Sequence, residues 1–222
     1  MGCRRRSSTP PRSPRCEREQ LAVLAAETLG RPDASAAGVV GAGVNGRAVA
    51  RMFRTVGREV VLWDVDRARA EAVADELGAS VATAREEALS ADVVATVTPG
   101  KEIVVAEGAL RPGQHVRLMG ADGPGKAEIA VGELARVHVF CDDWKQVVHS
   151  GTLDTSRAVE EGVLRREDVT ELGAVLAGLA PGRRSDDEIT VFDSTGLAIQ
   201  DLAIALAALE RADELDLSRI EV

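Results

Sequence analysis

The sequence predicts an α/β fold in which a doubly wound parallel sheet carries helices on both faces. Two observations predict it. Short apolar runs alternate with segments of helical spacing from residue 36 to residue 193. The first run leads directly into a Gly-x-Gly-x-x-Gly motif, whose glycines are Gly41, Gly43 and Gly46. A strand, a tight turn and an amphipathic helix are therefore expected at the start of the sheet.

Composition narrows the class of protein. The chain has 222 residues, of which 45% are hydrophobic, so it can bury a large core. Its net charge of −9 argues against a nucleic-acid partner, and no apolar run is long enough to span a membrane. The three cysteines have no metal-ligand spacing with one another or with the histidines. We therefore expect no metal site and a reduced, cytoplasmic protein.

The segment ahead of the sheet divides into two parts. Residues 1–16 are basic, rich in Ser and Pro, and free of acidic residues, which predicts a disordered leader; an organelle transit peptide is the alternative. Residues 17–29 then show helical spacing, which residues 30–33 interrupt. The apolar face expected for this helix consists of Leu21, Leu24, Ala25 and Leu29.

The glycine motif has a chemical interpretation. Gly41 permits the turn, Gly43 lets the backbone approach a pyrophosphate, and Gly46 lets the helix pack closely on the strand. Phosphate oxygens would then meet free N–H groups at the positive end of the helix. A structural turn without a ligand is the alternative. The apolar stripe predicted for the helix consists of Val44, Ala48, Val49, Met52, Phe53 and Val56.

Asp64 follows the second predicted strand, residues 59–63, about 20 positions beyond the glycines. A carboxylate there can accept hydrogen bonds from the adenosine ribose hydroxyls. The alternative is a helix N-cap, but neighbouring Asp66 fills that role equally well. We favour the ribose role. Asp64 would also repel a 2′-phosphate, which indicates NAD rather than NADP, although Arg67 is near enough to leave NADP open.

Further elements follow in order. Asp66 is expected to cap a helix that runs to Leu77 and stops at Gly78. A weak strand (residues 80–82) and a short helix (85–89) precede strands at residues 92–98, 115–120, 136–141 and 188–193, and a helix at residues 197–211 ends the pattern. Ligands bind at the carboxyl ends of strands in such sheets, so Thr98 is expected to touch the cofactor.

The loop of residues 122–126 is a second candidate site. Asp122 at the end of a central strand is suited to general acid/base chemistry. A turn in which Asp122 bonds to local backbone explains the spacing equally well.

Two segments resemble the ornithine cyclodeaminase/mu-crystallin family. They are Gly-Ala-Asp-Gly-Pro-Gly-Lys-Ala-Glu at residues 120–128 and Ile-Thr-Val-Phe-Asp-Ser-Thr-Gly-Leu-Ala-Ile-Gln-Asp at residues 189–201. Within this family the chain is most similar to the archaeal-type alanine dehydrogenases. The resemblance runs from about residue 25 to the C-terminus, with Thr152 where the family usually has Glu.

The resemblance implies an NAD-dependent oxidoreductase or cyclodeaminase that acts at the α-carbon of a small amino acid, through an imine, with release of ammonia. Asp122 would be the catalytic acid/base, Thr195 would bind the substrate, and the enzyme would be a homodimer. The residues implied to touch the cofactor are Asn45, Gly46, Val116, Leu118, Met119, Lys126 and Ser194.

The resemblance also implies a domain organisation. Residues 34–193 would form the NAD-binding Rossmann domain, and residues 17–33 and 194–222 would be remnants of a second, substrate and dimerisation domain. Family members carry most of that domain ahead of the sheet, including a lysine and an arginine of the active site, where this chain has 35 residues. A truncated homologue that binds dinucleotide without catalysis is therefore the alternative function.

Overall fold

The structure is a computed structural model that describes residues 16–121, 123, 125–150, 154–194, 196–212 and 214. The expected leader up to residue 15 lies outside these residues, as do Asp122, Thr152 and Thr195. In the described part of the chain, no helix is both long and apolar enough to cross a membrane.

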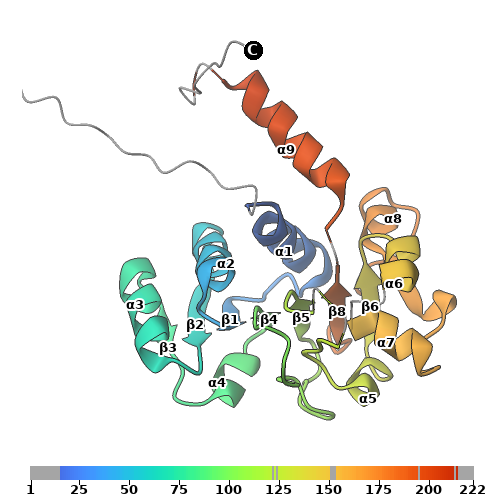
Figure 1. The fold of residues 1–222 in the computed structure, drawn as a ribbon, viewed down its shortest axis with the longest axis horizontal. Helices are drawn as coiled ribbons and strands as arrows, with labels where there is room; N and C mark the ends of the chain where they lie inside the picture. The colour runs from blue at the N-terminus through green and yellow to red at the C-terminus, as the bar shows by residue number, and fades with distance from the viewer. Residues whose placement is uncertain are drawn as a thin grey trace, which may run out of the picture.

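One parallel sheet organises the described residues (Figure 1). Its strand order is β3-β2-β1-β4-β5-β8-β6-β7, so the last strand along the chain lies inside the sheet. The strands are β1 (Ala36–Val40), β2 (Glu59–Trp63), β3 (Ser80–Val81), β4 (Val93–Thr96), β5 (His115–Leu118), β6 (His138–Cys141), β7 (Val169–Glu171) and β8 (Thr190–Asp193). The order turns at β1 and β4, which confirms a doubly wound α/β fold.

Helices cover both faces of the sheet. In Figure 1, α1 (Cys16–Leu29), α2 (Val44–Thr55) and α3 (Arg67–Leu77) lie above it, while α4 (Arg85–Leu89), α5 (Val131–Leu134) and α7 (Asp154–Glu160) lie below. Two more helices, α6 (Trp144–Ser150) and α8 (Leu172–Leu176), lie at the β6 end, and a 3₁₀ turn (Arg166–Asp168) precedes β7. Each face buries its own apolar cluster, because strands such as β4 are buried on both sides.

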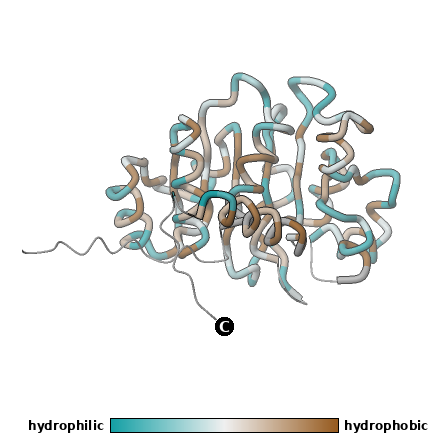
Figure 2. Tube along the Cα trace, turned by 90° about the horizontal axis from the view of Figure 1, so that it is seen from above, coloured by the Kyte–Doolittle hydropathy of each residue, from teal (hydrophilic) through white to brown (hydrophobic). Residues whose placement is uncertain are grey.

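The C-terminal helix α9 (Ala198–Glu210) projects away from this body (Figure 1). Hydrophobic residues recur along it in Figure 2, where it lies nearest the viewer. Ile199, Leu202, Leu206 and Leu209 are each more than half exposed, at 67%, 55%, 51% and 66%. This helix therefore presents an apolar face to solvent in the single chain.

The sequence predicts most element boundaries to within a few residues. Asp66 caps α3 by accepting from the Arg69 N–H, and Gly78 ends it at a φ of 62°, as expected. Two predicted helix faces are only partly right, because Leu21, Ala25 and Leu29 of α1 and Val49 and Phe53 of α2 are buried as expected but other members of each face are not. The buried face of α2 consists of Gly46, Val49, Ala50 and Phe53, whereas Val44 and Val56 are exposed. In α1, Leu24 is exposed and Ala22 and Ala26 are buried instead.

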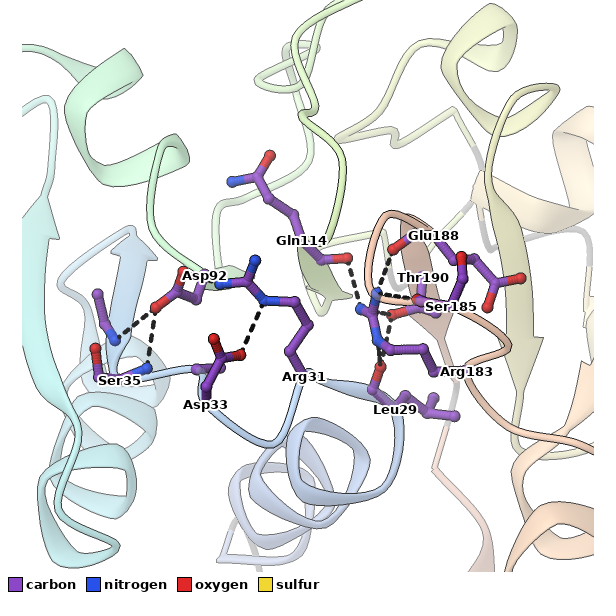
Figure 3. A network of polar contacts seen from close by, with 12 residues as sticks. Leu29, Arg31, Asp33, Ser35, Asp92, Gln114, Arg183, Ser185, Glu188 and Thr190 are labelled. Carbon is purple, nitrogen blue, oxygen red and sulfur yellow. Dashed lines mark hydrogen bonds and ion pairs between the residues drawn. The ribbon is translucent and has the colours of Figure 1, made fainter.

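The side chains of two arginines, Arg31 and Arg183, bond to residues at the amino ends of several strands (Figure 3). The Arg183 guanidinium donates to the Leu29 carbonyl at 2.8 Å and, at 3.1 Å, to the Gln114 carbonyl and Thr190 Oγ1. Arg31 pairs with Asp92, whose other oxygen accepts from the Ser35 and Ala36 N–H groups. The end of α1 is thus fixed to β1, β4, β5 and β8, on the edge opposite the candidate site.

Candidate functional site

A cavity of about 370 Å³ opens at the carboxyl ends of β1, β2, β4 and β5. This is the point where the strand order turns, and it is where ligands bind in doubly wound sheets. Its lining comes from five places in the chain: the glycine loop with the start of α2, the end of β2, the first turn of α3, the end of β4, and the segment after β5. The lining residues are Gly41, Gly43, Val44, Asn45, Gly46, Trp63, Asp64, Val65, Arg69, Val97, Thr98, Pro99, Met119, Gly120 and Lys126.

The three glycines of the loop have different surroundings. Gly41 has a φ of 107°, and a Cβ on it would lie 2.4 Å from the Val97 carbonyl oxygen. A Cβ on Gly46 would lie 1.8 Å from the Gly41 carbonyl oxygen, so only glycine lets α2 pack this closely on β1. A Cβ on Gly43 would meet nothing within 4 Å. Gly43 therefore leaves open space on the pocket side, as an approaching pyrophosphate requires.

The start of α2 offers donors to this space. Gly43 is the N-cap and has no side chain to bond to the first N–H groups of the helix. Such groups, together with the positive end of a helix of 12 residues, attract phosphate oxygens. Asn45 Oδ1 is also buried here without a hydrogen-bond partner among the described residues. The loop thus fits a dinucleotide pyrophosphate.

Asp64 lines the pocket just beyond the end of β2. Its Oδ2 accepts from the Ala42 N–H at 2.7 Å and its Oδ1 from the Asp66 N–H at 2.8 Å. Arg69, from the first turn of α3, approaches the same two oxygens at 3.5 and 3.3 Å. Asp64 therefore links the glycine loop to β2, and its side chain is only 5% exposed. The N-cap role belongs to Asp66.

Glu128 joins the ends of β4 and β5 beneath the pocket. Its fully buried carboxylate accepts from Thr96 Oγ1 at 2.7 Å and, through its other oxygen, from the Thr98 N–H at 2.8 Å and Thr98 Oγ1 at 2.7 Å. On the β5 side it accepts from the Met119 N–H at 3.1 Å and the Gly120 N–H at 2.6 Å. These hydrogen bonds hold the residues at the carboxyl ends of β4 and β5 in fixed positions beside the pocket.

More buried carboxylates continue along this edge. The backbone N–H of Glu128 donates to both oxygens of Asp154 at 3.1 Å, and Thr155 donates to Asp193 at the end of β8 through its N–H and its hydroxyl at 2.8 Å. Burial, reinforced by the charge of Asp193, raises the pKa of Asp154. Burial also raises the pKa of Asp193 and of Asp142, which follows β6 and accepts from the Gly196 N–H at 2.8 Å.

Most of the site residues expected from the sequence lie around this pocket, and the others that the structure describes do not line it. Gly41, Gly43, Asn45, Gly46, Asp64, Thr98, Met119 and Lys126 all line the pocket. Val116 and Leu118 are buried in the core below it. Ser194 lies at the end of β8, where its hydroxyl accepts from the buried Arg117 guanidinium at 2.7 Å. Asp122 and Thr195, the residues implied for catalysis and substrate binding, lie outside the described part of the chain.

Sequence reasoning missed Arg69 and Glu128. Arg69 is five positions beyond Asp64 in the first turn of a predicted helix, a position from which it can turn back to the strand end. Glu128 is the one charged residue in the run Ala127-Glu128-Ile129-Ala130, and a lone carboxylate in such a run is a signal for a buried, hydrogen-bonded group.

The chain is similar in sequence to known proteins. The model of the ornithine cyclodeaminase/mu-crystallin family matches residues 21–216. Alanine dehydrogenase of Archaeoglobus fulgidus is 41% identical over 199 residues, which cover 85% of this chain and 60% of that protein. This chain thus spans less than two thirds of the length of that relative.

Several solved structures share the fold, and two of them are NAD complexes of enzymes that are also similar in sequence. An archaeal alanine dehydrogenase dimer with bound NAD superposes with a TM-score of 0.83 at 37% identity, over 92% of this chain and 66% of the other. The iminosuccinate reductase of Paracoccus denitrificans in complex with NAD⁺ gives the same TM-score at 29% identity, over 93% and 66% of the two chains.

Proposed function

Because this chain belongs to the ornithine cyclodeaminase/mu-crystallin family, we propose that it is an NAD-dependent oxidoreductase acting on the α-amino group of a small L-amino acid. One observation supports this most directly. A single cavity runs from the glycine loop and Asp64 to Met119, Gly120 and Lys126. A dinucleotide has an adenosine half and a nicotinamide half, and this cavity offers each half a separate set of strand ends.

NAD, when bound, accepts a hydride from the substrate α-carbon. The substrate is left as an imine, from which water releases ammonia in a dehydrogenase. In an ornithine cyclodeaminase the δ-amine attacks the imine carbon instead, ammonia leaves, and the hydride returns to the cyclic imine that is formed. In this chain the N–H groups of the glycine loop and α2 would bind the pyrophosphate, and Asp64 would accept from the ribose. We assign the proton transfer to Asp122, contacts with the cofactor to Lys126 and Ser194, and the substrate end to Thr195.

The proposal extends to the organisation of the protein. Residues 34–193 would be the cofactor domain, and residues 17–33 and 194–222 would belong to a substrate and dimerisation domain. The solved archaeal alanine dehydrogenase is a dimer. The exposed apolar face of α9 supports self-association of this chain too. We propose a cytoplasmic location, which agrees with the free, buried thiol of Cys141.

A second candidate is a protein that binds dinucleotide without turnover. The observation that favours it is coverage: the aligned residues make up 60% of the Archaeoglobus alanine dehydrogenase. Hydride transfer needs a site that orients the substrate and excludes water, and a second domain commonly closes such a site.

One experiment separates the two candidates. The purified chain is mixed with NADH, pyruvate and ammonium, and the loss of NADH absorbance is followed while NADH binding is measured by fluorescence. The first candidate predicts turnover that Asp122→Asn abolishes and that Asp75→Asn, an exposed aspartate on α3, leaves unchanged. Binding without turnover supports the second candidate. Absence of NADH binding contradicts both.

A further inference from the structure

The ribose corner of the pocket contains a cation as well as the expected carboxylate. Arg69 Nη1 lies 3.3 and 3.5 Å from the two oxygens of Asp64, and Arg69 Nη2 lies 3.3 Å from Asp66 Oδ2. Among the described residues that line the pocket, Arg69 and Lys126 are the two cations, and Lys126 belongs to the segment after β5. Arg69 is therefore the cation that faces the adenosine ribose end.

Asp64 has little spare capacity for ribose hydroxyls while Arg69 is in place. A carboxylate offers about four acceptor positions. Backbone N–H groups of Ala42 and Asp66 occupy one on each oxygen, and Arg69 approaches both oxygens. A ribose hydroxyl that bonds to Asp64 must share these positions with the guanidinium or displace it. The Arg69 side chain is 50% exposed, so it has room to move aside.

The same guanidinium suits a phosphate. A phosphate group carries about two negative charges at neutral pH, and arginine binds it with two parallel hydrogen bonds. Arg67, whose place in the sequence left NADP open, lies elsewhere: its guanidinium pairs with Glu71 at 2.7 Å, and it does not line the pocket. Arg69 also neutralises part of the charge by which Asp64 would repel a 2′-phosphate.

We propose that Arg69 forms a subsite for the 2′-phosphate of NADP, so that the chain accepts NADP(H) as well as NAD(H). This inference rests on the dinucleotide function proposed above. Asp64 and Asp66 outnumber Arg69 in charge, so NADH remains the tighter ligand. NADPH binds by drawing Arg69 from Asp64 to the phosphate.

Binding measurements on two matched variants test the proposal. Arg69→Ala and Arg67→Ala each remove one exposed guanidinium from the same helical turn, and only Arg69 lines the pocket. NADH and NADPH are titrated by calorimetry, as are 5′-AMP and 2′,5′-ADP, which differ only in the 2′-phosphate. We expect Arg69→Ala to weaken NADPH and 2′,5′-ADP at least about tenfold, as for loss of a charge-assisted hydrogen bond, and to leave NADH and 5′-AMP within about twofold. Arg67→Ala should change none of the four.

Three results overturn the proposal. One is a wild-type chain that binds neither NADPH nor 2′,5′-ADP, and another is an Arg69→Ala variant that weakens NADH as much as NADPH. The third is an equal effect of Arg67→Ala. In each case retained NADH binding by the wild type leaves the proposed function standing, whereas loss of NADH binding itself counts against that function.

Discussion

Asp64 bonds to the backbone of the glycine loop as well as facing the pocket, so its replacement changes both the shape and the charge of the ribose end. We expect Asp64→Ala to weaken NADH binding about tenfold, the usual effect of losing hydrogen bonds to a charged group. NADPH should lose less, because the repulsion between the carboxylate and a 2′-phosphate disappears as well. Fluorescence titration of both coenzymes measures the ratio.

The matched control is Asp75→Ala, which removes an exposed carboxylate from α3 outside the pocket. It should leave both affinities unchanged. Unaltered affinities of the Asp64→Ala variant for NADH and NADPH would contradict the proposal that Asp64 binds the ribose.

His115 makes the stability of the protein depend on pH. Burial, followed by the charges of Arg183 and Arg117, lowers the pKa of His115 from 6.5 to about 3. The unfolded chain therefore binds a proton on this residue between pH 6.5 and about 3 that the folded chain does not. The contribution of His115 to the free energy of unfolding therefore falls as the pH falls through this window, by up to about 1.4 kcal/mol per pH unit.

The variant His115→Asn removes this titration and keeps a polar group near Thr190 Oγ1, which lies 2.9 Å from Nδ1. Urea unfolding at a series of pH values should show that the wild type loses stability relative to the variant as the pH falls below 6.5. Parallel declines for the two proteins would show that His115 is not the residue responsible.

Sequence reasoning succeeds for single residues that act on their neighbours in the chain. Asp66 and Gly78 cap and end α3 through local backbone geometry, and the pattern of the sequence predicts both. It cannot find the partners of Glu128, because the N–H groups of Thr98 and Gly120 reach that carboxylate only after β4 and β5 have paired.

At the scale of elements, α2 and the glycine loop form one unit. The predicted stripe of α2 is displaced because its buried face includes Gly46, which has no side chain and so carries no hydrophobic signal. Apolar runs that are buried on both faces, such as β4, are recognised from their composition. The three-residue strand β7 and the short helices α5 to α8 contain too few residues to show a hydrophobic periodicity, so the sequence pattern does not predict them.

A matched pair of alanine variants separates the packing role of this unit from its binding role. Gly46→Ala places a Cβ 1.8 Å from the Gly41 carbonyl oxygen, so α2 must move off β1. We expect a loss of about 2 kcal/mol or more in the free energy of unfolding. The Cβ of Gly43→Ala meets nothing within 4 Å, so the free energy of unfolding should fall by no more than about 1 kcal/mol, the effect of alanine in place of glycine at an N-cap.

The affinity for NADH should respond to Gly43→Ala, the variant whose stability changes least. The Cβ of Gly43→Ala enters the space through which a pyrophosphate approaches the backbone, so its affinity should fall at least about tenfold in spite of a stable fold. Chemical denaturation and coenzyme titration of both variants make the comparison. Normal NADH affinity in Gly43→Ala would contradict the role of the loop.

At the scale of the whole molecule, α9 is the part least supported by the rest of the described chain. Leu202 and Leu206 are 55% and 51% exposed on neighbouring turns of one helix face. We expect the purified chain to self-associate in sedimentation velocity, and Leu202→Glu combined with Leu206→Glu to shift it toward a monomer. Leu179→Glu changes a leucine that is 82% exposed outside α9, and it should leave the association unchanged. A monodisperse wild-type monomer would refute this.

The place of β8 in the sheet also affects how the protein is made. β8 pairs with β5 on one side and β6 on the other, so β6 and β7 join the rest of the sheet through a strand that is synthesised after all the other described strands. At about 5–20 residues per second, β1 to β5 have seconds in which to assemble before β8 emerges. During those seconds the nascent chain exposes two unpaired strand edges, at β5 and β6, which are the kind of surface that pairs with other chains and that chaperones shield.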